Sequence, residues 1–147
     1  MLTNVINQYA DGLAAPMVFH GPSSANYDHT VKEPLVLSDW VNGPAEGAYQ
    51  DEQDPVKRGA STDSILLNGV GQVTAPGVAR SFTGGSISTA YPVIKVVPGK
   101  KNRLRIINMS IATGFVFSID GHNFTVIGND FVPVKPYTTN SIVVAIG

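Results

Sequence analysis

The histidines are the side chains best suited to metal or acid–base chemistry in this sequence, and there are three: His20, His29 and His122. Metal sites usually draw histidines from short patterns such as H-x-H or H-x₃₋₅-H, and this spacing matches neither. The chain has no cysteine, so it offers no thiolate ligand, disulfide or cysteine nucleophile. We therefore expect loop or turn histidines, with the His122 ring hydrogen-bonded to nearby backbone.

The acidic and glycine-rich clusters also favour structural interpretations. Asp51, Glu52 and Asp54 stand among glutamines and a proline, which is typical of a solvated loop and not of a catalytic carboxylate pair. The glycine-rich segments 68–71 and 84–85 lack the lysine and spacing of a phosphate-binding loop, so both are predicted to be turns. The G-x-S-x-G pattern of serine hydrolases does not occur.

One basic cluster stands out, comprising Lys100, Lys101, Arg103 and Arg105. On a strand, the last three of these share one face and Leu104 and Ile106 take the other. We favour a solvated or domain-facing polar face over a phosphate site, because no aromatic residues interleave. The net charge of −1 argues against a nucleic-acid partner or an anionic membrane surface.

Short apolar runs separated by 15 glycines and 10 prolines must position these residues. Such punctuation predicts an antiparallel β-sandwich with one short helix at 45–53. Asp120-Gly121 is expected to be a hairpin turn. The expected strands are 16–20, 35–40, 64–67, 93–97, 103–107, 115–119, 123–127 and 141–146.

Targeting signals are sparse. No run of about eighteen apolar residues predicts a membrane span. The first residues lack the basic start and apolar core of a signal peptide. Asn108 and Asn123 begin N-x-[ST] sequons, which matter only if the chain enters the secretory route.

Five segments follow the pattern of one known family in order and spacing. They are NQYADGLAAPMVFHGP (7–22), ANYDHTVKEPLVLSDW (25–40), STDSILLNGVGQ (61–72), PGKKNRLRIINMS (98–110) and FVFSIDGHNFTVIGNDFVPVKPYTTNSIVVAIG (115–147). Together they resemble the fungal laccase-like multicopper oxidases over nearly the whole chain. The resemblance implies an all-β, cupredoxin-like Greek-key β-sandwich that is incomplete. Residues 1–24 would end the first plastocyanin-like domain, and 25–147 would form the second, truncated at its C-terminal strands.

The departures from the family pattern limit what the chain can do. The His-Ser-His copper ligands of the family align with Leu2, Thr3 and Asn4, none of which is a strong copper ligand. The other ligands belong to regions of the first and third domains outside this sequence. The family's middle domain binds no copper, and it bridges the flanking cupredoxin domains that do.

The resemblance also assigns the loop after the R-x-R strand to one wall of the substrate pocket, at Ala112, Thr113 and Phe115. Laccases commonly place a carboxylate there to accept a hydrogen bond from a phenol. Ala112 takes that position here and cannot accept the proton. A disulfide found in some relatives is also missing, because its positions are Ala10 and Ile111.

Two functions follow. The first is a copper-free piece of an extracellular oxidase, inactive alone, whose intact form oxidises phenols or similar donors with copper and reduces O₂ to water. A variant of it has separate chains supplying the missing domains. The alternative is a stand-alone, non-catalytic binding module that stacks ligands on its aromatic residues. The candidates for stacking are Trp40, Tyr49, Tyr91 and Tyr137.

Overall fold

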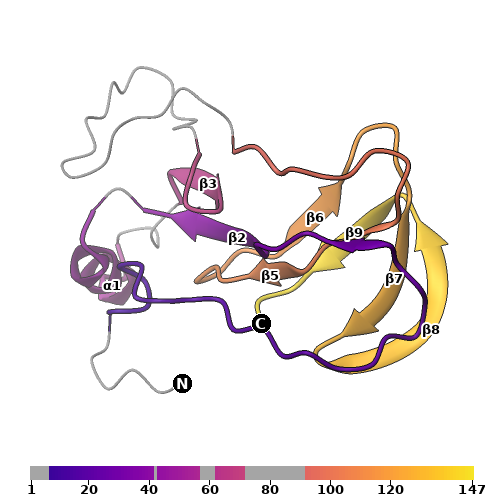
Figure 1. The fold of residues 1–147 in the computed structure, drawn as a ribbon. Helices are drawn as coiled ribbons and strands as arrows, with labels where there is room; N and C mark the ends of the chain where they lie inside the picture. Colours follow the sequence, from indigo (N-terminus) through magenta and orange to yellow (C-terminus); the bar gives the residue numbers. More distant parts are fainter. Residues whose placement is uncertain (1–6, 42, 57–61, 72–91) are drawn as a thin grey trace.

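The computed structural model describes residues 7–41, 43–56, 62–71 and 92–147, and most of their regular structure is β-strand (Figure 1). The single helix of these residues, α1 (Ala45–Gln53), lies where the sequence predicts it. The strands are β1 (His29–Thr30), β2 (Leu35–Trp40), β3 (Ser64–Leu67), β4 (Asn102–Arg103), β5 (Ile106–Asn108), β6 (Phe115–Ser118), β7 (Phe124–Asn129), β8 (Val132–Thr139) and β9 (Ser141–Val144).

Strand β2 is the centre of a three-stranded sheet in the order β3-β2-β5. It alternates strictly, with Leu35, Leu37 and Asp39 buried on one face. Its pairing with β3 is antiparallel, but its pairing with β5 is parallel, as is that of β1 with β4. The antiparallel pairing expected from the sequence therefore holds for β2–β3, β6–β9 and β7–β8 but is wrong for β2–β5 and β1–β4. Parallel neighbours require a long crossover, and the chain from β2 to β5 is long enough to provide it.

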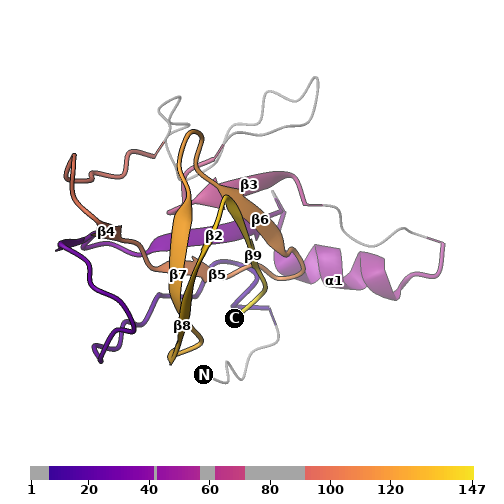
Figure 2. The same ribbon diagram turned by 90° about the vertical axis from the view of Figure 1, so that its right-hand side faces the viewer.

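The Asp120-Gly121 turn does not close a hairpin. β6 pairs with β9 and β7 pairs with β8, so the turn carries the chain from one strand pair to another. Of the two central residues of this turn, only Gly121 has a positive φ, of 71°. The His122 N–H donates to the Ile119 carbonyl at 3.1 Å. A positive φ at this single position is the type II pattern, which splays the flanking strands. In Figure 2 the β7–β8 ribbon runs steeply across the direction of β2.

Two other turns have the geometry that tight hairpins need, with positive φ at both central residues. One is the predicted glycine-rich turn at Asn68-Gly69, with φ of 51° and 77°. The other is Asp130-Phe131, with φ of 45° and 67°, between β7 and β8. The sequence did not predict β8, because its two prolines disfavour a strand. β8 pairs only with β7, and an edge strand tolerates proline.

Two predicted strands do not form. The runs 16–20 and 93–97 have no ladder partner and stay irregular. Among the described residues the buried apolar core is small, consisting of Val31, Leu35, Leu37 and Ala45. Phe117 and Phe124 add a ring contact at 5.8 Å between β6 and β7. Val116 and Val143 are cross-strand partners that remain 73% and 78% exposed, so the face of the β6–β9 pair that carries them is open.

Candidate functional site

A buried carboxylate organises the loop between β5 and β6. Asp39, in β2, is 3% exposed. It accepts hydrogen bonds from the backbone N–H groups of Ile111, Ala112 and Thr113 at 2.8, 3.1 and 3.1 Å. The Thr113 hydroxyl adds a fourth bond at 2.7 Å. A carboxylate with four donors is well compensated for its burial, so the loop is fixed around Asp39.

Two further buried side chains hold the two ends of this loop. Asn108 accepts from the Ser110 N–H at 2.9 Å and donates to the carbonyls of Thr113 and Val144 at 2.8 and 2.9 Å. The Ser110 hydroxyl in turn accepts the Asp39 N–H at 3.1 Å. The network connects β2, the loop and β9, and it leaves little freedom to the backbone of 108–113.

The same bonds set the ionisation of the site. Burial by itself would raise the pKa of Asp39, but the donations from Ile111, Thr113 and Ala112 lower that pKa below its ordinary value. Asp39 is therefore a carboxylate at neutral pH. Burial, and next the charge of Asp39, raises the pKa of Tyr9, whose hydroxyl lies 3.4 Å from the Ser110 carbonyl.

The segment that carries Tyr9 packs across the start of α1. The Asp11 carboxylate accepts the Ala45 N–H at 2.8 Å and so caps the helix from a distant part of the chain. Gly12 has a φ of 94°, and a Cβ atom there would lie 3.3 Å from the Trp40 ring. The early segment thus docks on the elements that surround Asp39.

The three residues predicted for a pocket wall lie together in this region. Ala112 is exposed, Thr113 is half-buried through its bonds to Asp39, and Phe115 begins β6 opposite Val144. Because the loop amides point inward, the surface offers the side chains of Ile111 and Ala112. Neither of these two side chains can accept a hydrogen bond.

Sequence reasoning missed Asp39, although a signal for it existed. Leu35, Leu37 and Asp39 share one face by the period of a strand, and two leucines mark that face as buried. A buried acid implies a set of donors. The donors themselves, being backbone amides of a loop, carry no sequence signature.

The two sequons differ in accessibility. Asn123 is exposed, whereas Asn108 is 2% exposed and uses its amide nitrogen for two hydrogen bonds. Of the acidic cluster, Asp51 and Glu52 lie in the last turn of α1 and not in a loop. Asp54 follows the helix and accepts the Val56 N–H at 2.9 Å.

The histidines stay apart from the Asp39 network. His20 is exposed, and His29 is half-buried in β1. His122 approaches the Asp120 carbonyl with its Nδ1 at 2.9 Å, in agreement with the expected backbone contact. The only helix among the described residues is α1, which has nine residues and is too short and polar to cross a bilayer.

Comparison with known proteins identifies the class. The multicopper oxidase family profile matches residues 32–147. A laccase of Arthroderma benhamiae is 46% identical over 140 residues, covering 95% of this chain and 20% of the relative. Laccase-1 of Botryotinia fuckeliana is 38% identical over 146 residues, covering 98% of this chain and 23% of the relative. The chain belongs to the multicopper oxidase family.

Solved structures place it more narrowly beside the fungal laccases. The laccase of Botrytis aclada matches with a TM-score of 0.77 and 32% identity, over 95% of this chain and 25% of that one. The all-β, cupredoxin-like Greek-key fold predicted from the sequence is thereby confirmed. The chain spans about a fifth to a quarter of the length of these relatives.

The family implies copper in the intact enzyme, but the described residues do not fit it. They contain no group of three or more His, Cys, Asp or Glu side chains that could hold a metal ion. A copper site needs several such ligands in one place. Leu2, Thr3 and Asn4, which align with the family's His-Ser-His motif, lie outside the described residues.

Proposed function

We propose that residues 25–147 are the copper-free middle domain of a laccase-type multicopper oxidase, and that residues 1–24 end the domain before it. The intact enzyme acts outside the cell and oxidises phenolic or similar donors with copper while reducing O₂ to water. This chain bridges the flanking copper-bearing cupredoxin domains and is inactive alone. Ala112, Thr113 and Phe115 form one wall of the donor pocket.

The observation that carries this proposal is the inward orientation of the loop amides toward Asp39. A wall that guides a donor must keep its shape while donors enter and leave. The bonds from Ile111, Ala112 and Thr113 to a buried anion provide that rigidity. The open Val116–Val143 face and the share of the relatives that this chain spans support the bridging role.

The wall can be tested in a hybrid in which residues 7–147 replace the matching segment of the Arthroderma benhamiae laccase. Ala112→Asp introduces a proton acceptor, so it should raise kcat/KM for a phenol at least about tenfold. A non-phenolic one-electron donor has no proton to give and should be oxidised as before. Ala112→Asn is the matched control, because it adds an equally large side chain that takes up no proton. Equal changes in kcat/KM for the phenol and the non-phenolic donor would show that Ala112 does not line the pocket.

Inactivity alone is tested on the 147-residue chain itself. After incubation with copper and dialysis, we expect well under one bound copper per chain and no oxygen uptake with a phenol. Oxygen uptake above that of free copper would overturn the proposal that this piece is non-catalytic.

The geometry does not favour the alternative binding module. Tyr49 lies on α1 and Tyr137 on β8, at opposite ends of the molecule in Figure 1. Trp40 is half-buried beside Gly12, and Tyr91 lies outside the described residues. Trp40, Tyr49 and Tyr137 therefore do not share one stacking surface.

A further inference from the structure

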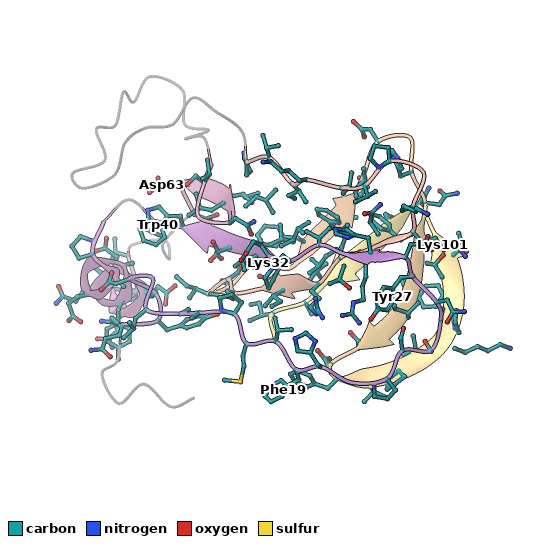
Figure 3. All side chains as sticks on the ribbon, in the orientation of Figure 1. Phe19, Tyr27, Lys32, Trp40, Asp63 and Lys101 are labelled. Carbon is teal, nitrogen blue, oxygen red and sulfur yellow. The ribbon has the colours of Figure 1, made fainter. Side chains whose placement is uncertain are left out.

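Two arginines of the basic cluster lie half-buried beside an aromatic ring. The guanidinium carbon of Arg103 is 4.2 Å from the centroid of the Tyr27 ring. The Arg103 and Arg105 carbonyls accept the N–H groups of Val31 and Leu35 at 3.0 and 2.7 Å, which fixes the backbone beneath both side chains. Figure 3 shows Tyr27 at the end of the molecule near Lys101 and far from Trp40.

One nitrogen of each guanidinium group lacks an acceptor. Arg103 Nε and Arg105 Nη2 are buried and have no hydrogen-bond partner. All eleven acidic residues of the chain lie in its described part, yet none of them forms an ion pair with either arginine there. Asp28, which follows Tyr27 in the sequence, already accepts the Lys101 backbone N–H at 2.8 Å.

The pair is unfavourable as it stands. Burial, and next the charge of Arg103, lowers the pKa of Arg105. Two like charges in a partly desolvated place are costly unless an anion joins them. Because the chain's own carboxylates are placed elsewhere, the missing anion must come from outside the chain.

We propose that Arg103 and Arg105, with Tyr27 against the Arg103 plane, form a binding site for a single carboxylate group. The planar guanidinium fork matches a carboxylate in two parallel hydrogen bonds. The Tyr27 ring orients the Arg103 fork, and the hydrogen bonds from Val31 and Leu35 hold the backbone at both arginines. The carboxylate is either an Asp or Glu side chain of a longer protein or a small free acid. The site does not depend on the proposed pocket wall.

The test titrates the 147-residue chain with sodium acetate at constant ionic strength and follows the arginine Nε–H signals by NMR. We expect saturable shifts of Arg103 and Arg105. Arg105→Gln should weaken acetate binding at least about tenfold, which corresponds to a lost charge-assisted contact. Lys101→Gln removes the same charge from an exposed neighbour and should leave the affinity within about twofold. Arg105→Lys keeps the charge and should still weaken binding, because it loses the fork.

Shifts that grow linearly without saturation, or equal weakening by Lys101→Gln and Arg105→Gln, would overturn the proposal. The wild-type titration decides the first point even if an arginine variant does not fold. The hybrid laccase separates the two sources of carboxylate. If a side chain of the longer protein occupies the site, acetate should not bind to the hybrid, and Arg105→Gln should lower the melting temperature of the hybrid. A free acid would leave acetate binding intact.

Discussion

The Thr113 hydroxyl donates a 2.7 Å hydrogen bond to the Asp39 carboxylate, 74 residues earlier in the chain. This bond closes a ring of four donors around a single buried anion. The shape of the loop that we assign to the substrate pocket thus depends on a carboxylate that is itself buried.

Asp39→Asn should destabilise the chain by about 2–4 kcal/mol, because an amide nitrogen would face donors and leave buried N–H groups unpaired. Urea unfolding followed by the fluorescence of Trp40, the single tryptophan, measures this. Glu52→Gln, at an exposed position of α1, is the control and should change stability by less than about 0.5 kcal/mol. Equal midpoints for both variants would show that the Asp39 network does not hold the loop.

The pH dependence of stability has one limb from each member of the Asp39–Tyr9 pair. The pKa of Asp39 is lowered, so its contribution is present above the unfolded value of about 3.9 and is lost as the pH falls through the folded pKa. The pKa of Tyr9 is raised, so its contribution is present below about pH 10 and is lost as the pH rises through the folded pKa. Asp39→Asn should flatten the acid limb and Tyr9→Phe the alkaline limb. An unchanged acid limb in Asp39→Asn would contradict this assignment.

Phe131 occupies a turn position that suits glycine, with a φ of 67°. Its ring meets that of Phe19 edge-on at 5.2 Å, which offsets part of the backbone cost. Phe131→Gly and Phe131→Ala both remove the ring and differ only in tolerance of this φ. We expect the glycine variant to be more stable by about 1 kcal/mol in thermal unfolding.

At Val132, the first residue of β8, the order of the two substitutions should reverse. Val132 is exposed and has no positive φ, so alanine there should be more stable than glycine by about 0.5–1 kcal/mol. The same order at both positions would mean that the Asp130-Phe131 turn carries no strain.

Glycosylation should distinguish the two sequons. When the chain is fused to a secretion signal and produced in yeast, the folded protein should carry a glycan on Asn123 and none on Asn108. The reason is that a glycosylated Asn108 amide keeps only one hydrogen and could not donate to both of its carbonyl partners, so chains modified there would not reach the native packing. Mass spectrometry of glycosidase-treated protein measures occupancy, with Asn123→Gln as the control. A glycan on Asn108 in natively folded protein would disprove the proposed packing.

Much of the fold could be predicted because local patterns decide it. The alternation in 35–40 and the Asn68-Gly69 turn depend on neighbouring residues alone, and both agree with the structure. Pairing partners were predicted less well. Asp120-Gly121 favours a hairpin locally, but tertiary packing sends β6 to β9 and β7 to β8. The runs 16–20 and 93–97 have strand-like composition, yet a strand also needs a neighbour to pair with.

The site divides in the same way. Family resemblance indicated Ala112, Thr113 and Phe115, and their place in a pocket wall stays a prediction. Their support from Asp39, Asn108 and Ser110 depends on backbone donors brought together by the fold, which composition and spacing do not encode.

The bond between Asn108 and the Val144 carbonyl has a consequence for biosynthesis. Proteins emerge from the ribosome from the N-terminus, so Asn108 leaves the exit tunnel before Val144 does. During that interval one hydrogen of its side-chain amide lacks the acceptor that β9 provides in the folded protein. The loop beside it therefore completes its hydrogen bonds only after β9 has left the exit tunnel, and until then a chaperone or a glycosylating enzyme meets an unfinished surface.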